Sequence, residues 1–84
     1  MYEVLIERRV ERQLRRLPED VLRRIARVMV DLGKDPRPPG CRKLVGSTND
    51  WRIRVGDYRL LYEVIDADRV VRVMHVRHRR DAYK

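Results

Sequence analysis

The spacing of apolar residues changes period near the middle of the chain. Val10, Leu14 and Leu17 recur at the four- and three-residue intervals of one helix face. From residue 42 onward apolar and polar residues instead alternate, most strictly in WRIRV (51–55), which is the period of a strand. A chain with helices first and strands second favours an α+β fold, in which a helical layer packs on a sheet.

Two helices are expected in the first half. The first covers residues 7–17 and ends before Pro18, which suits the first turn of the second helix. The apolar face of the second helix consists of Val21, Leu22, Ile25, Val28, Met29 and Leu32. Gly33 follows this face and predicts the helix end, because glycine readily adopts the left-handed conformation found after helices. The segment DPRPPG (35–40) cannot continue a helix.

Short strands are expected on both sides of this helical hairpin. They are YEVLIE (2–7), RKLV (42–45), WRIRV (51–55), YRLLYEVI (58–65) and VVRVMHV (70–76). Tight turns between the last three predict an antiparallel meander. The predicted architecture is a single domain over residues 1–84 in two layers, an N-terminal strand and helical hairpin packed on an antiparallel sheet (β-α-α-β-β-β). The helices should cover one sheet face and leave the other free. The expected core includes Leu14, Ile25, Met29, Ile53 and Leu60, together with Trp51, Tyr58 and Tyr62.

The chain is strongly basic. Its 21 Lys and Arg residues against 13 Asp and Glu residues give a net charge of +8, and the excess is shared by both halves. A small folded domain with this charge favours a polyanionic partner, nucleic acid ahead of membrane. One cysteine and two histidines make no metal-ligand set, so no metal or cofactor is expected. No apolar run reaches the length of a membrane span or a signal peptide, which favours a soluble, cytoplasmic protein.

Several arginines can converge at one end of the sheet. Arg52 and Arg54 share a strand face, and Arg59 begins the neighbouring strand across a tight turn. The last strand runs into His78, Arg79, Arg80, Tyr83 and Lys84. Two interpretations remain open, an ordinary solvated strand face and a basic site. Arg59 favours the site, because a charge that enters the most apolar strand needs a reason.

The helical hairpin, the KLVG segment (43–46), WRIRVGDYRLLYEVID (51–66) and the terminal VRHRRDAY (76–83) together resemble the RelE/ParE superfamily of toxins from toxin–antitoxin pairs. The resemblance covers essentially the whole chain, and HRRDAY favours the RelE branch. It implies a RelE-like microbial RNase fold. It also implies a metal-independent endoribonuclease that inhibits translation by cleaving mRNA in the ribosomal A site, through attack of a 2′-hydroxyl on the neighbouring phosphate.

The resemblance assigns the active site to Arg52, Arg54, Arg59, Arg79 and Tyr83. Negative charge builds on the phosphate during attack, and fixed cations such as Arg59 and Arg79 would stabilise it. Arg52 and Arg54 replace lysines of the best-known relative. Because arginine keeps its proton, we expect them to bind RNA, as we do Arg80 and Lys84.

Proton transfer then falls to His78 or Tyr83, and the sequence does not decide which of them acts as acid or base. The histidine has an ordinary pKa near the working pH, at about 6.5, whereas tyrosine at about 10 would need a cationic surrounding. Tyr83 could instead stack on a base of the substrate. Arg77 stands where relatives commonly have glycine, which marks a departure in the backbone near the site.

Two other functions remain possible from the sequence. One is a ParE-like poison of DNA gyrase, and the other is a non-catalytic basic module that binds nucleic acid. For a toxin, the expected partners are an antitoxin with an acidic, partly disordered segment, the ribosome and mRNA. Operator DNA would be contacted only through the antitoxin complex, and no membrane partner is expected.

Overall fold

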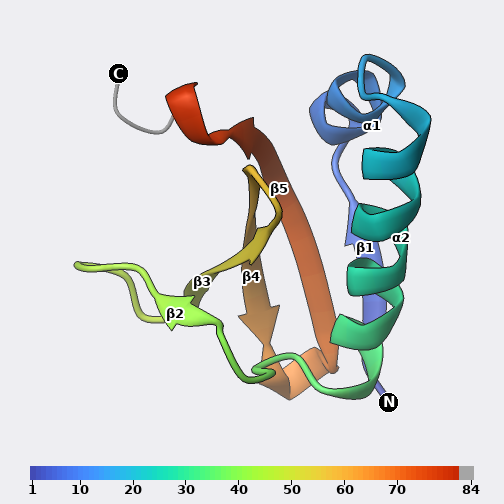
Figure 1. Ribbon diagram of the computed structural model, residues 1–84. Helices are drawn as coiled ribbons and strands as arrows, with labels where there is room; N and C mark the ends of the chain where they lie inside the picture. The colour runs from blue at the N-terminus through green and yellow to red at the C-terminus, as the bar shows by residue number, and fades with distance from the viewer. Residues whose placement is uncertain (82–84) are drawn as a thin grey trace.

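The computed structural model describes residues 1–81 as a sheet with two helices on one side (Figure 1). The strands are β1 (Glu3–Ile6), β2 (Arg42–Lys43), β3 (Asp50–Val55), β4 (Tyr58–Ile65) and β5 (Val70–His78). The helices are α1 (Arg8–Arg15) and α2 (Glu19–Lys34), with short 3₁₀ turns η1 (Asp66–Asp68) and η2 (Arg79–Asp81). The predicted order of helices and strands is confirmed.

The five strands form one sheet in the order β1-β5-β4-β3-β2. Strands β3, β4 and β5 make the predicted antiparallel meander. Strand β1 differs from the antiparallel expectation, because it pairs with β5 in parallel, from Glu3 opposite Val70 to Ile6 opposite Val73. No hairpin joins these two strands, so no turn dictates antiparallel pairing, and the sheet is mixed.

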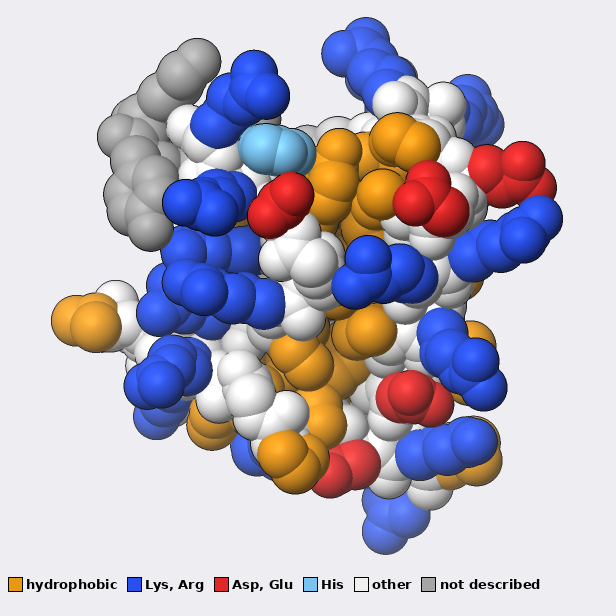
Figure 2. All heavy atoms as spheres, viewed as in Figure 1, with side chains coloured by type: hydrophobic (Ala, Val, Ile, Leu, Met, Phe, Trp, Pro, Cys, Tyr) orange, Lys and Arg blue, Asp and Glu red, His pale blue; other side chains and the backbone are white. Residues whose placement is uncertain are grey.

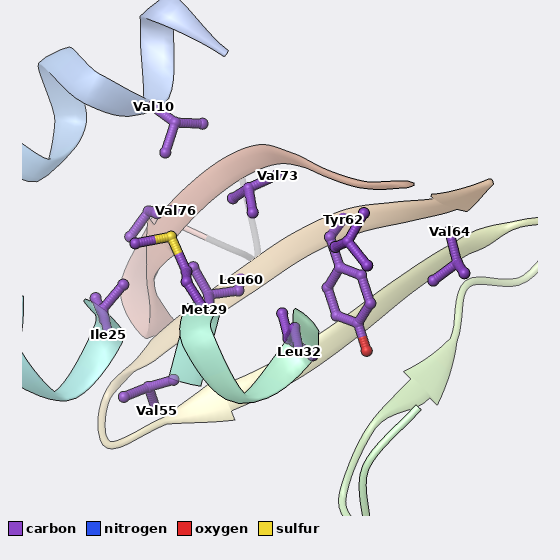
Figure 3. Close-up of a cluster of buried hydrophobic side chains, with 11 residues drawn as sticks. Val10, Ile25, Met29, Leu32, Val55, Leu60, Tyr62, Val64, Val73 and Val76 are labelled. Carbon is purple, nitrogen blue, oxygen red and sulfur yellow. The ribbon is translucent and has the colours of Figure 1, made fainter. Parts of the chain in front are cut away.

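The core lies between the sheet and the helices (Figure 3). Its fully or almost fully buried members are Val10, Ile25, Met29 and Leu32 from the helices and Val55, Leu60, Tyr62, Val64, Val71, Val73 and Val76 from the sheet. Of the predicted core, Leu14, Trp51, Ile53 and Tyr58 are partly buried and pack against this cluster. The helices therefore cover one face, as expected.

Gly33 does not end the second helix, so this prediction is wrong. Helix α2 runs through Gly33 to Lys34, and Asp35 after it is extended. The backbone N–H of Tyr2 donates to the carbonyl oxygen of Gly33 at 2.7 Å. A Cβ on Gly33 would lie only 3.0 Å from the backbone carbonyl oxygen of Tyr2. The glycine thus permits the chain before β1 to approach the helix closely. The helix ends before Pro36, because a residue that precedes proline disfavours helical geometry.

An irregularity in β5 decides which side chains face the helices. Tyr62 is opposite Val73, but Leu61 is opposite His75, so Met74 is an extra residue in β5. Such a bulge reverses the alternation of side chains for every residue that follows. Val76 therefore faces the core opposite Leu60, and Arg77 comes to the open face opposite Arg59.

The segment after α2 is held to the sheet by polar contacts. The buried hydroxyl of Tyr62 donates to the carbonyl oxygen of Pro36 at 2.8 Å. Arg37 forms two hydrogen bonds with the carboxylate of Asp66, which also accepts one from the hydroxyl of Tyr2. These bonds, from Arg37 first and then Tyr2, lower the pKa of Asp66. The contacts position the chain that leads into β2.

Candidate functional site

Three arginines lie side by side across the open face of the sheet. Arg54 in β3 is directly opposite Arg59 in β4, and Arg59 is directly opposite Arg77 in β5. Like charges at directly opposed positions destabilise a sheet. A row of three such residues on adjacent strands is therefore an arrangement suited to holding an anion. We call Arg54, Arg59 and Arg77 the arginine row.

Two further arginines extend this positive surface toward the edge of the sheet. Arg52 lies two residues before Arg54 on the same face of β3, and Arg42 in β2 is directly opposite it. One depression of about 300 Å³ is lined by Gly40, Arg42, Arg52 and Arg54. A second, of about 220 Å³, is lined by Leu44, Arg52, Arg59, Leu61 and Arg77. The basic surface is thus continuous and hollowed from β2 to β5.

The turn between β3 and β4 closes one end of this surface. Gly56 takes a φ of 61°, a conformation that glycine adopts without strain. The backbone N–H of Arg79 donates to the carbonyl oxygen of Asp57 at 2.6 Å, which ties the end of β5 to the turn. The resulting pocket of about 230 Å³ is lined by Arg54, Gly56, Asp57, Tyr58, Arg59 and Arg79. We call it the turn pocket.

The ion pair of Arg72 with Glu63 lies on the same open face, farther along β4 and β5 from the arginine row. The other ion pairs within residues 1–81 involve residues that do not line the depressions described above. Carboxylates pair with Arg9, Arg23, Arg37 and Arg72. Arg42, Arg52, Arg54, Arg77 and Arg79 form no ion pair among the described residues. Figure 2 shows Lys and Arg side chains crowded on the left of the view, where Figure 1 places β2 and β3. This part of the surface therefore has cationic groups available for a ligand.

The structure gathers four of the residues predicted for the site. Arg52 and Arg54 lie on the open face with Arg59, and Arg79 reaches it through the turn pocket. Arg80 is exposed and lies with Arg79, Asp57 and His78 around a neighbouring depression. Tyr83 and Lys84 lie outside the described residues.

His78 occupies a different side of the sheet from the arginine row. It is opposite Tyr58, and their rings meet edge to face with centroids 4.9 Å apart. Its Nδ1 accepts a hydrogen bond from the backbone N–H of Arg80 at 3.2 Å. Because of the bulge at Met74, His78 follows Val76 on the face that the helices cover.

Two residues of the basic surface were missed from the sequence. Arg42 joins the surface because β2 pairs with β3. The RKLV segment predicts a strand, but it does not indicate which strand lies beside it. Arg77 was noted only as a departure from glycine. Its backbone is part of regular β5 with no positive φ, so an arginine is accommodated there without strain. Strict alternation from Val73 would have turned Arg77 toward the core.

The chemistry available in the described residues is that of fixed cations. Guanidinium groups can bind phosphate oxygens bidentately and stabilise added negative charge, but they do not exchange protons near neutral pH. Within residues 1–81, no three His, Cys, Asp or Glu side chains gather as a metal ion would require. No helix in this part of the chain is long and apolar enough to cross a membrane.

Comparison with known proteins agrees with the fold. The family described as "ParE toxin of type II toxin-antitoxin system, parDE" matches residues 4–83. A Methanocaldococcus jannaschii protein described as toxin RelE1 is 30% identical over 86 residues, which cover 99% of this chain and 96% of that protein.

Two solved structures are also similar. The RelE–RelB complex from Pyrococcus horikoshii contains a chain that is 31% identical, with a TM-score of 0.85 over 93% of this chain and 94% of that one. The isolated Escherichia coli RelE toxin is 29% identical, with a TM-score of 0.82 over 93% of this chain and 84% of that one. The protein therefore belongs to the RelE/ParE superfamily and is a RelE-family toxin of a toxin–antitoxin system.

Proposed function

We propose that the protein is a ribosome-dependent endoribonuclease that cleaves mRNA in the ribosomal A site and so inhibits translation. The observation that supports this most strongly is the arginine row, Arg54, Arg59 and Arg77, directly opposed on three strands. Such a row is unfavourable for the folded state by itself, and a phosphodiester lying across it would remove the repulsion. The reaction class follows from the RelE relationship.

The cleavage step places demands that the arginines can meet. The 2′-oxygen of one nucleotide attacks the adjacent phosphorus, and the bond to the 5′-oxygen of the next nucleotide breaks. Negative charge on the phosphate oxygens rises in the transition state. We assign Arg59 and Arg79, which both line the turn pocket, to these oxygens. Arg52 and Arg54, with Arg42 and Arg77, would hold the neighbouring phosphates.

Proton transfer requires a group other than arginine. A base must accept the proton of the 2′-hydroxyl, and an acid must protonate the departing 5′-oxygen. His78 faces Tyr58 rather than the arginine row, which favours Tyr83 as the proton carrier near the scissile phosphate. In general, a nearby guanidinium group favours the phenolate form of a tyrosine, which is the form that can accept a proton.

An antitoxin is the proposed protein partner. Solved relatives include the RelE–RelB complex from Pyrococcus horikoshii and the RelBE toxin–antitoxin complex from Escherichia coli. For this chain, a net charge of +8 favours an antitoxin with an acidic segment that folds as it binds. We propose that operator DNA is reached only through that complex.

Primer extension on an mRNA, with and without ribosomes, tests the activity. We expect cleavage only with ribosomes. Arg59→Gln and Arg79→Gln should each lower the cleavage rate by about 10²–10³-fold, the usual effect of removing one group that stabilises transition-state charge. Arg27→Gln removes the same charge from the exposed side of α2 and serves as the control, with an unchanged rate. Equal losses in all three variants would contradict a localised site.

A gyrase supercoiling assay separates the second candidate. The matched family bears the ParE name, and ParE-like toxins act on gyrase, so this outcome has specific support. We expect no inhibition of supercoiling. Inhibition without any ribosome-dependent cleavage would overturn the proposal and assign the protein to the gyrase poisons.

A further inference from the structure

Another concave site lies beside the second half of β5, where the C-terminal end of α1 approaches the strand. It measures about 480 Å³, and its polar lining comes from Gln13, Arg16, Tyr58, His75, Arg77 and His78. We call it the α1–β5 groove. None of the described residues that line it carries a carboxylate, so its two guanidinium groups favour an anionic ligand.

The end of β1 explains why α1 borders this groove. Strand β1 stops at Ile6, so within residues 1–81 no strand pairs with β5 on that side beyond Val73. The side chain of Gln13 takes the place of a strand there, because its Oε1 accepts the backbone N–H of Val76 at 2.9 Å. This bond orients the amide and leaves Nε2 as the end that can donate to a ligand.

His75 provides a second sign that the groove is built for a ligand. Its Nδ1 is buried and has no hydrogen-bond partner among the described residues. Buried polar atoms without a partner are rare, and one at the wall of a groove indicates a missing polar contact. Burial lowers the pKa of His75, and repulsion from Arg9 and Arg77 adds to this. An anion in the groove would offset the repulsion from the two arginines.

The groove continues the proposed RNA surface. Arg77 lines the α1–β5 groove and also the depression that contains Arg52 and Arg59. An RNA strand that crosses the arginine row from β3 to β5 would therefore pass over Arg77 and arrive beside Arg16. The edge-to-face pair of Tyr58 and His78 offers ring surfaces of the kind that unpaired bases contact.

We propose that the α1–β5 groove is a subsite for single-stranded RNA, which holds a nucleotide flanking the cleaved phosphate. Arg16 and Arg77 bind the phosphate of this nucleotide, and the Nε2 of Gln13 donates to it or to its base. The subsite rests on the proposed function, because that function places RNA across the arginine row. An acidic peptide segment is the competing ligand.

Binding of a fluorescent single-stranded RNA octanucleotide, with 2′-O-methyl groups that prevent attack, tests this without requiring cleavage. Arg16→Gln is compared with Arg12→Gln, which removes the same charge from an exposed position of α1 outside the groove. Gln13→Glu keeps an oxygen for the N–H of Val76 and introduces a carboxylate beside the phosphate. Melting curves establish that each variant is folded.

We expect Arg16→Gln and Gln13→Glu to weaken binding by about fivefold to tenfold, the loss of one charge-assisted contact. For Arg16→Gln the slope of log K against log salt should also shrink by about 0.7, the value for one phosphate of a single strand. Arg12→Gln should change neither quantity appreciably. Equal effects of Arg12→Gln and Arg16→Gln would overturn the subsite, as would failure of the unmodified protein to bind the octanucleotide.

Two further outcomes separate the subsite from the proposed function. If the groove variants weaken binding of an acidic antitoxin peptide and leave RNA binding unchanged, the groove belongs to a protein partner and the subsite is wrong. If the RNA results are as expected but the unmodified protein cleaves no mRNA on ribosomes, the proposed function fails, and the groove stands only as a binding site for single-stranded RNA.

Discussion

At the scale of single residues, the candidate site consists of arginines, whose side chains stay protonated and positively charged. Arg54, Arg59 and Arg77 are directly opposed in the sheet, where any pair of like charges is unfavourable. Guanidinium groups fit phosphate oxygens well but cannot serve as acid or base. In the proposed reaction, proton transfer would therefore need a residue of another type, and the placement of His78 beside Tyr58 favours Tyr83 in the proposal.

Two substitutions distinguish these proton carriers. Tyr83→Phe keeps the ring and removes the hydroxyl, and we expect a loss of about 10²–10⁴-fold in ribosome-dependent cleavage, the usual contribution of general acid–base catalysis. His78→Gln should leave the pH profile of cleavage unchanged, because the imidazole packs on Tyr58 and accepts the Arg80 N–H. A pH profile that loses a step in His78→Gln would show that the histidine carries the proton.

At the scale of helices and strands, short irregular features place the functional side chains. The extra residue Met74 reverses the faces of β5 and brings Arg77 to the open side. The bond from Arg79 to Asp57 joins the end of β5 to the β3–β4 turn. The segment between α2 and β2, which leads to Arg42, is tied to the sheet through Tyr62 and Pro36.

The bond between Tyr62 and Pro36 can be tested by removing one hydroxyl. Tyr62→Phe leaves the carbonyl oxygen of Pro36 without its partner, next to a fully buried ring. We expect the free energy of unfolding to fall by about 1–2 kcal/mol, as for other buried groups that lose a hydrogen-bond partner. Urea unfolding provides the measurement.

Tyr58→Phe is the matched control for this stability experiment. The hydroxyl of Tyr58 forms no hydrogen bond among the described residues, so its removal should change the free energy of unfolding by less than about 0.5 kcal/mol. Equal losses in the two variants would contradict a specific role for the bond between Tyr62 and Pro36.

At the scale of the whole molecule, charge is the dominant property. The net charge is +8, and Arg42, Arg52, Arg54 and Arg77 form no ion pair among the described residues, so a positive surface runs from β2 to β5. On the proposed function, the field that would attract RNA would also attract an acidic antitoxin, so the two partners would compete for this surface. The outcome of this competition would depend on the overlap of the two binding surfaces and on the affinity of each partner.

The electrostatic part of antitoxin binding can be measured by titration calorimetry of the purified pair. We expect the dissociation constant to rise by at least about tenfold when salt is raised from about 0.1 M to about 0.5 M, because screening weakens attraction between exposed charges. A dissociation constant that does not change with salt would show that apolar contacts carry the complex.

The sequence by itself determined the kinds of secondary structure, their order, the two-layer class and the basic character. These follow from local spacing. Apolar residues recur at helical intervals within each helix, as Val10 and Leu14 do in the first and Ile25 and Met29 in the second, and Trp51 and Ile53 alternate with arginines. Arg52, Arg54 and Arg59 could be placed together because a tight turn joins their strands, so their register depends on neighbours in the chain.

Only the tertiary structure decided the rest, because it depends on contacts between distant segments. The parallel pairing of β1 with β5, and the approach of Gly33 to Tyr2, follow from packing that no local pattern specifies. The bulge at Met74 moved Arg77 to the open face and His78 to the other, against strict alternation. One extra residue reverses the direction of every later side chain, and it becomes evident only in the pairing of β5 with β4, not in the residues of β5 alone.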